Sequence, residues 1–276
     1  MKIKVKFFDK NLIQEYKSLV STLVAILTTV LIFKDIPTTY KNYCFIVFII
    51  FLSIIYLFLW IRNNRIKKVK LTINNSNLEI KYGNIFEQEG LKVIAFNEFF
   101  DTKITDRLIS SQTLNGIYLK NVVSDINKLD IDIESDQYLS KKIIERNIDR
   151  IEGKTIRYEL GSIYKNEDYL LTAFSKFDLD NRAYLTIKDY NNFLINFWDE
   201  IDKIYNAENI SVPLFGSNIT RFRGYNLSEQ LLLELLIWSF KLSKFSHSNS
   251  SKISIVLHKN IIDKINLYKL KTLFND

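Results

Sequence analysis

Residue types that build reactive centres are scarce in this chain of 276 residues, which holds one cysteine and two histidines. Cys44 lies in an apolar run and has no second cysteine to pair with, so an internal disulfide is excluded and a reducing compartment is expected for the soluble part. The usual zinc site draws its ligands mainly from cysteine and histidine, and too few are present. His247 and His258 are the two candidates for a Ser-His-Asp triad, and neither has a recognisable setting. We therefore predict no catalytic residue, no metal site and no cofactor.

A basic surface for nucleic acid is missing as well, although the formal net charge is +7. Lysine, isoleucine and asparagine are abundant along the whole chain, which spreads the positive charge instead of concentrating it. Proteins that bind nucleic acid gather arginine and lysine on one face or along one helix. Outside the flanks of two apolar runs the sequence contains no such stripe, and we expect no nucleic-acid partner.

Two mostly apolar runs in the first third of the sequence, residues 18–34 and 43–61, predict a pair of transmembrane helices. The second run is almost wholly apolar and approaches the roughly 20 residues that a helix needs to cross a bilayer; its alternative is a buried core helix. The first run is shorter and contains five serines and threonines, and its alternative is an interfacial or signal-like segment. Pro37 separates the runs, so residues 18–61 are expected to form a helical hairpin.

The charges beside these runs predict their orientation. Five lysines precede the first run and five basic residues follow the second, whereas the short loop carries two lysines and one aspartate. By the positive-inside rule both termini are cytoplasmic, with residues 1–17 as a cytoplasmic N-terminal segment of a multi-pass protein. Residues 62–69 form a basic juxtamembrane linker, which we expect to contact anionic membrane lipid.

Residues 70–276 alternate between strand-like and helix-like patterns, which favours a layered α/β domain. Strands are predicted at residues 69–73, 78–82, 91–96, 155–164, 169–176, 210–215 and 253–257. Helices are predicted at residues 118–126, 137–151, 186–205, 228–245 and 261–274.

One loop of this domain has the composition of a phosphate cradle. An apolar run ends at Phe215, and a helix is expected from Ser228. Glycine, serine and threonine at such a junction turn backbone N–H groups toward one point, where an anion binds. The alternative is an ordinary loop between a buried strand and a helix. The candidate residues are Gly216, Ser217, Asn218, Ile219, Thr220 and Arg221.

Four stretches, in order, resemble one family. VIAFNEFFDT (93–102), LISSQTLNG (108–116), YLLTAFSKFDLDNRAYLT (169–186) and VPLFGSNITRF (212–222) are similar to the divergent macro domain of membrane-anchored Thoeris antiphage effectors. Two transmembrane helices precede the macro domain in that subgroup, as they are expected to do here. The resemblance implies a macro-domain-like α/β/α fold behind a transmembrane hairpin, in the inner membrane of a bacterium.

The resemblance also implies a function in antiviral defence. A TIR-domain partner converts NAD into a signal, and the macro domain binds this ADP-ribose conjugate, which is histidine-ADP-ribose in the characterised branch. Binding is expected to drive homo-oligomerisation, membrane disruption and death of the infected cell. Two alternatives stay open: a membrane-tethered ADP-ribosyl hydrolase, and a non-catalytic scaffold for ADP-ribosylated proteins.

The resemblance assigns ligand-binding roles to individual residues. Asn84 and Ile85 match the element that contacts adenine, with asparagine in place of the usual aspartate. Asn97 matches the first asparagine of the loop beside the distal ribose, and the second asparagine of that loop is missing, which weakens the case for hydrolase chemistry. The remaining ribose and loop candidates are Asp101, Thr102, Ser111 and Gly116, and the phosphate cradle is the loop of Gly216 to Arg221.

Overall fold

The computed structural model describes residues 3–74, 76–105, 108–178, 180–206, 208–217, 221–243 and 252–274. The chain forms two compact units. Unit 1 consists of Met1–Val69 together with Asn266–Asp276, and unit 2 consists of Lys70–Ile265. The sequence pattern predicts a single domain over residues 70–276, whereas residues from Asn266 onward belong to unit 1, because a helix in this segment packs there.

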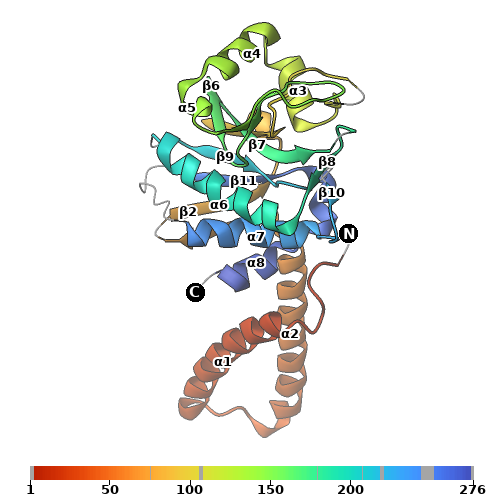
Figure 1. The fold of residues 1–276 in the computed structure, drawn as a ribbon. Helices are drawn as coiled ribbons and strands as arrows, with labels where there is room; N and C mark the ends of the chain where they lie inside the picture. Colours follow the sequence, from red (N-terminus) through yellow and green to blue (C-terminus); the bar gives the residue numbers. More distant parts are fainter. Residues whose placement is uncertain are drawn as a thin grey trace. The chain divides into compact units, whose positions relative to one another are not determined.

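The described residues of unit 1 fold mainly into helices (Figure 1). They are α1 (Lys10–Phe33), α2 (Thr38–Asn64) and α8 (Leu267–Phe274). Asp9 caps α1 by accepting hydrogen bonds from the backbone N–H groups of Asn11 and Leu12. Pro37 directly precedes α2. Both α1 and α2 are long and apolar enough to cross a membrane, and apolar side chains such as Ile26 and Phe58 are exposed along them. The two predicted apolar runs are therefore helices.

The core of unit 1 is built from residues of both ends of the chain, because α8 packs against the N-terminal segment, α1 and α2. Val5, Leu12, Leu59 and Tyr268 are buried together in one cluster. Glu15 of α1 accepts hydrogen bonds from Asn63 Nδ2 at 2.8 Å and from the Tyr268 hydroxyl at 3.2 Å, and it also pairs with Arg62. Burial, and then the negative charge of Glu15, raise the pKa of Tyr268, which keeps this hydroxyl a donor.

Unit 2 is built on one mixed sheet. Its strands follow the order β1-β2-β11-β9-β3-β7-β8-β10, and β6 pairs with β7. Neighbouring strands from β2 to β7 are parallel. The bounds are β1 Lys68–Ile73, β2 Ser76–Tyr82, β3 Leu91–Asn97, β6 Ile163–Asn166, β7 Tyr169–Phe177, β8 Ala183–Leu185, β9 Ile210–Pro213, β10 Arg221–Phe222 and β11 Ile253–Leu257.

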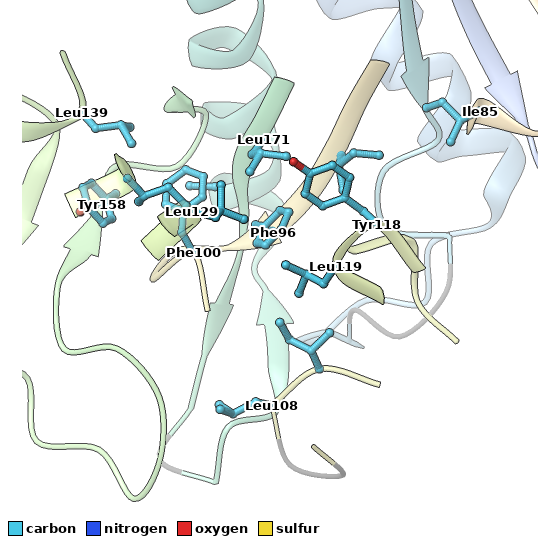
Figure 2. Packing of buried hydrophobic residues seen from close by; sticks show 14 of the residues in the cluster. Ile85, Phe96, Phe100, Leu108, Tyr118, Leu119, Leu129, Leu139, Tyr158 and Leu171 are labelled. Atoms are coloured by element: carbon cyan, nitrogen blue, oxygen red, sulfur yellow. The ribbon is translucent and has the colours of Figure 1, made fainter. Parts of the chain in front are cut away.

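Helices cover both faces of this sheet, which confirms the layered α/β/α fold. On one face, Phe96 and Leu171 of the sheet pack with residues of α3 (Leu114–Asn121), α4 (Ile126–Ser135) and α5 (Gln137–Ser140). Figure 2 shows Phe96 and Phe100 near the middle of this cluster and Ile85 toward its periphery. On the other face, Phe174 contacts Tyr190 and Phe193 of α6 (Ile187–Ile204), and Trp198 of α6 contacts Phe240 of α7 (Glu229–Leu242).

Three predicted helices differ in the structure. The one expected at residues 118–126 is α3, which begins at Leu114 and ends at Asn121, because Thr113 caps it by accepting a hydrogen bond from the backbone N–H of Gly116. Residues 137–151 form only the short α5 and then a strand, β4 (Ile143–Glu145), because this segment pairs with β5 (Arg157–Tyr158) in a small antiparallel sheet. Residues 261–274 are divided between the 3-10 helix η2 (Lys259–Lys264) and α8, with Ile265 extended between them. The predicted strand 155–164 is likewise divided between β5 and β6.

Candidate functional site

Three loops that contain predicted ligand residues leave the same edge of the sheet. Strands β2, β9 and β3 belong to the parallel part of the sheet, and β9 lies beside β3. Parallel strands end at a common edge, and open α/β sheets bind ligands outside the carboxyl ends of their strands. The loops that follow these three strands therefore define the candidate site.

The loop after β2 contains an exposed side-chain amide, that of Asn84, followed directly by a buried side chain, that of Ile85. Asn84 is exposed and caps the 3-10 helix η1 (Ile85–Glu87), where its side chain accepts from Phe86 N at 3.2 Å and donates to Glu87 at 3.1 Å. Ile85 is 5% exposed and belongs to the apolar cluster of Figure 2. The side chain of Asn84 is therefore accessible from solvent, and Ile85 packs in the core beneath the loop. A contact of either residue with a ligand stays a prediction.

The loop after β9 turns at a glycine that no other residue replaces without strain. Gly216 has φ +79°, and a Cβ atom there would lie 2.9 Å from Cζ of Phe222. The hydroxyl of Ser217 donates to the carbonyl oxygen of Leu214 at 3.0 Å, which closes the turn. Asn218, Ile219 and Thr220 lie outside the described residues, and of Arg221 only the backbone is described, in register with Tyr184.

The loop after β3 holds Asn97 in a closed set of internal hydrogen bonds. Asn97 is 2% exposed. Its Oδ1 accepts from the backbone N–H groups of Phe99 at 3.0 Å and Asp101 at 3.3 Å, and its Nδ2 donates to Asp101 Oδ2 at 3.0 Å. This side chain shapes the loop in the structure, so a direct contact with ribose stays a prediction.

Asp101 is the anionic centre of this loop. It is 1% exposed and accepts two hydrogen bonds from the Arg150 guanidinium, at 3.2 Å and 2.9 Å. The backbone N–H of Lys154 donates to it at 2.7 Å. Arg150 also donates to Asn181 at 2.8 Å and lies 3.8 Å from the ring centroid of Phe99. A buried carboxylate that is paired in this way is satisfied without a ligand.

The other predicted residues occupy different surroundings. The Thr102 hydroxyl, which is nearly buried, donates to Asp130 Oδ1 at 2.7 Å. Ser111 is exposed just before α3. Gly116 is buried in the first turn of α3, where a Cβ atom would lie 2.2 Å from the carbonyl oxygen of Ser110. Gly116 therefore permits a close backbone approach that holds the Ser110–Ser111 segment against the helix.

Three functional candidates were missed from the sequence. Arg150, which lies 49 residues beyond Asp101, pairs with this carboxylate, and Asn181 accepts a hydrogen bond from Arg150. No local pattern in the sequence marks either residue. Glu98 follows Asn97 directly, is 4% exposed and accepts from Phe177 N at 3.2 Å. Burial raises the pKa of Glu98, although the Phe177 hydrogen bond and nearby cations oppose this shift. The sequence could have marked Glu98 as a candidate, because it directly follows Asn97, which matches the asparagine of the family motif.

Two further observations bound the chemistry of the described residues. None of their His, Cys, Asp and Glu side chains form a group of three or more that is placed to hold a metal ion. A polar cavity of about 280 Å³ opens near Lys81, Gln88, Asn209 and Lys252. Asn209 and Lys252 precede β9 and β11, so this part of the cavity lies at the amino ends of those strands and not at the edge that carries Gly216.

Comparisons with known proteins agree on one family. The family model described as "Thoeris protein ThsA, Macro domain" matches residues 78–258. The chain is 38% identical over 275 residues to Thoeris protein ThsA of Bacillus amyloliquefaciens strain Y2, which covers 98% of this chain and 92% of the relative.

Solved structures with a similar fold include the Oceanobacillus iheyensis macrodomain with ADP. It is 16% identical, has a TM-score of 0.46, and the match covers 75% of this chain and 96% of that one. A mutant of the same macrodomain with ADPR is 15% identical with a TM-score of 0.49, over 75% and 98% of the two chains.

Proposed function

This chain belongs to the Thoeris ThsA macro-domain family, and we propose that it is an antiphage effector whose macro domain binds an ADP-ribose-derived signal. The signal is histidine-ADP-ribose or a related conjugate, made by a TIR-domain partner. Binding drives homo-oligomerisation through the membrane hairpin, and the assembled effector disrupts the bacterial inner membrane, with both termini in the cytoplasm.

The turn at Gly216 carries this proposal. Its positive φ and its close approach to Phe222 produce a tight loop at the carboxyl edge of the sheet, where backbone N–H groups can meet a diphosphate. Asn84 is exposed after β2 along the same edge and offers an amide to the adenine. Ser111 is exposed before α3 and is a candidate for the ribose.

The loop after β3 supports binding without turnover. A hydrolase must hold a water molecule against the distal ribose with free polar groups. The side chain of Asn97 instead bonds to Asp101 and to two backbone N–H groups, and Asp101 is paired with Arg150. We therefore propose that the chain is a sensor and not an enzyme.

Assembly follows only if the ligand distinguishes two states. A ligand shifts an equilibrium by its difference in affinity for the two forms, so the assembled form must bind the signal more tightly than the resting form. The hairpin of α1 and α2, by its length and apolar composition, supplies the segment that would assemble in the bilayer.

Calorimetric titration of the full-length chain in detergent with ADP-ribose, histidine-ADP-ribose and NAD tests the proposal. We expect saturable heat with one conjugate, recovery of that nucleotide intact, and loss of the heat in Gly216→Asp, which adds a charge and a clash at the turn. Cleavage of the nucleotide would instead favour the hydrolase. No heat from a folded chain would contradict nucleotide binding, and binding of ADP-ribosylated protein without assembly would favour the scaffold.

A further inference from the structure

The two long helices of unit 1 differ in how they carry polar groups. Between Ser18 and Phe33, α1 contains five serine and threonine residues, whereas Ser53 is the one such residue between Tyr43 and Ile61 of α2. We define the hydroxyl face of α1 by these five residues, which are all exposed: Ser18, Ser21, Thr22, Thr28 and Thr29.

The hydroxyl face points away from α2. The ring of Tyr16 lies edge-on to that of Tyr56 in α2, with 5.1 Å between the centroids, so Tyr16 marks the side of α1 that faces α2. With 3.6 residues per turn, Ser18 is rotated by about 200° from Tyr16. Thr22 and Thr29 follow at four and eleven residues from Ser18 and continue the same side, flanked by Ser21 and Thr28. Where Tyr16 packs on Tyr56, the hydroxyl face therefore lies on the side of α1 opposite to α2.

These hydroxyl groups do not disturb the helix, and they can still bond to water. Thr22 donates to the carbonyl oxygen of Ser18 at 3.1 Å, and Thr29 donates to that of Ala25 at 2.8 Å. Ser21 and Thr28 donate to Lys17 and Val24 in the same way, at 2.8 Å and 2.9 Å. Each hydroxyl oxygen keeps lone pairs that accept a hydrogen bond from water.

A face of this kind is poorly matched to lipid. Serine and threonine within transmembrane helices are enriched where the helix faces other helices of an assembly, and their hydroxyl groups bond there to groups outside their own helix. From Ser18 to Thr29 the face extends for about 16 Å, roughly half of the hydrocarbon core, at 1.5 Å per residue. Asn11 and Gln14 continue it toward the start of α1, and Ile32, which is 77% exposed, continues it at the other end.

We propose that the hydroxyl face of α1 lines a water-filled pore formed by several copies of this chain. In this arrangement α2 faces the lipid, and Ile32 forms an apolar constriction at which the pore closes by dewetting. The inference rests on the proposed function, because it requires the hairpin to insert and the copies to assemble. It goes further by naming the helix, and the face of that helix, that meets water.

Cysteine accessibility in proteoliposomes tests which face meets water. In a Cys44→Ser background, single cysteines are introduced as Thr22→Cys and Thr29→Cys on the hydroxyl face, and as Leu23→Cys on the side of Tyr16. After addition of histidine-ADP-ribose, a membrane-impermeant thiol reagent should modify the first two on the order of tenfold faster than the third. Equal rates at the three positions would overturn the pore. So would cross-linking of Thr22→Cys between copies without reaction with the reagent, because that result means a dry contact.

Dye release from the same vesicles gives a second readout. Thr22→Val with Thr29→Val keeps the shape of both side chains and removes two hydroxyl groups, and release should fall on the order of tenfold. Ser53→Ala is the matched control in α2, where the hydroxyl donates to Ile49 at 2.9 Å, and release should be unchanged. Equal release from the double variant and the control would overturn the inference.

The same samples distinguish a failure of the proposed function from a failure of the pore proposal. A chain that gives no heat with the nucleotide, or that alkaline extraction removes from the membrane, contradicts the proposed function and the pore together. A chain that binds, stays in the membrane and releases dye, but protects Thr22→Cys from the reagent, contradicts only the pore.

Discussion

At the scale of single residues, the Asp101–Arg150 pair is the most constrained contact near the candidate site. Both side chains are almost fully buried, at 1% and 6% exposure, and the guanidinium donates twice to the carboxylate. Arg150→Met leaves the Asp101 charge buried without its partner, so we expect a loss of about 3–5 kcal/mol in unfolding free energy. Chemical denaturation followed by circular dichroism measures it.

Arg182→Met is the matched control for this prediction. Arg182 pairs with Asp180 at 3.4 Å, but both side chains are more than 60% exposed. Exposed pairs contribute about 0–1 kcal/mol, so this variant should unfold nearly as the unaltered chain does. Equal losses in the two variants would contradict a special role for Arg150.

Alanine variants at Gly216 and Gly224 distinguish the effect of backbone strain from the effect of a steric clash in the ligand loop. Both have positive φ, +79° and +80°, so alanine strains both, at roughly 1–2 kcal/mol each. At Gly216 the new Cβ would also meet Phe222 at 2.9 Å, whereas at Gly224 no atom lies within 4 Å. Titration with histidine-ADP-ribose should show binding at least about tenfold weaker for Gly216→Ala, which corresponds to a loss of about 1.4 kcal/mol in binding free energy. Binding by Gly224→Ala should be unchanged. Equal weakening in Gly224→Ala would mean that the loop is not specifically involved.

At the scale of whole elements, the sequence predicted correctly those helices whose formation depends on residues within the helix itself. Helix α6 was predicted within a residue or two because its apolar face recurs at helical spacing. In the structure, Thr186 and Asp189 form a capping box at its start. The helix expected over 137–151 did not form beyond Ser140, because β4 pairs with β5 across an intervening loop that contains Asn147 at φ +57°. Such pairing depends on a partner strand and leaves little signal in the segment itself.

A buried carboxylate, Glu200 of α6, accepts a hydrogen bond from α5, and its contribution to the stability of the fold should depend on pH. Glu200 is 2% exposed and accepts from Tyr138 at 2.5 Å, Lys203 at 2.8 Å and Lys142 at 3.1 Å. Burial alone would raise the pKa of Glu200, but these three hydrogen bonds outweigh it and lower the pKa below its usual value. The folded state therefore gains stability from Glu200 above the unfolded pKa, and it loses this gain as the pH falls through the lower folded pKa.

Glu200→Gln should remove that pH-dependent contribution. We expect its unfolding free energy to be lower by about 1–3 kcal/mol at neutral pH, with the difference from the unaltered chain shrinking below about pH 4. Denaturant titrations across this pH range measure the difference. Glu208→Gln, at an exposed carboxylate 3.6 Å from Lys165, is the control and should leave the curve unchanged. A difference that does not vary with pH would contradict the role of the Glu200 charge.

At the scale of the whole molecule, unit 1 is closed by a helix from the far end of the chain. Tyr268 of α8 is 3% exposed in the core of unit 1, whereas Leu273 on the same helix is 38% exposed. Tyr268→Ala should destabilise unit 1 by about 3–5 kcal/mol, and Leu273→Ala by no more than about 0.5 kcal/mol. Limited proteolysis within residues 3–9 reports the opening. Equal resistance in both variants would mean that α8 does not close this unit.

The candidate site shows how far a sequence determines such an arrangement. The family motifs marked the segments that follow β2, β3 and β9 as ligand loops, because these motifs are shared by relatives; the strand order that brings the three loops to one edge comes from the structure. They did not predict that Asn97 donates to Asp101 four residues further along, because the resemblance assigned both side chains to the ligand. They also did not predict that Arg150 neutralises Asp101, because that contact joins residues that lie 49 positions apart. The loop at 218–220 lies outside the described residues, so its ligand contacts stay predictions.

The place of α8 in the chain also sets an order of events on the ribosome. Glu15 and Leu12 are translated early, but Tyr268, their partner in unit 1, is added about 200 residues after the end of α2. At about 5–20 residues per second, the nascent hairpin waits on the order of 10–40 s for its closing helix. During that interval the whole macro domain is synthesised. A chain that stalls or is cut short within the macro domain therefore has the hairpin but not α8, and unit 1 is completed only in chains that already carry the whole macro domain.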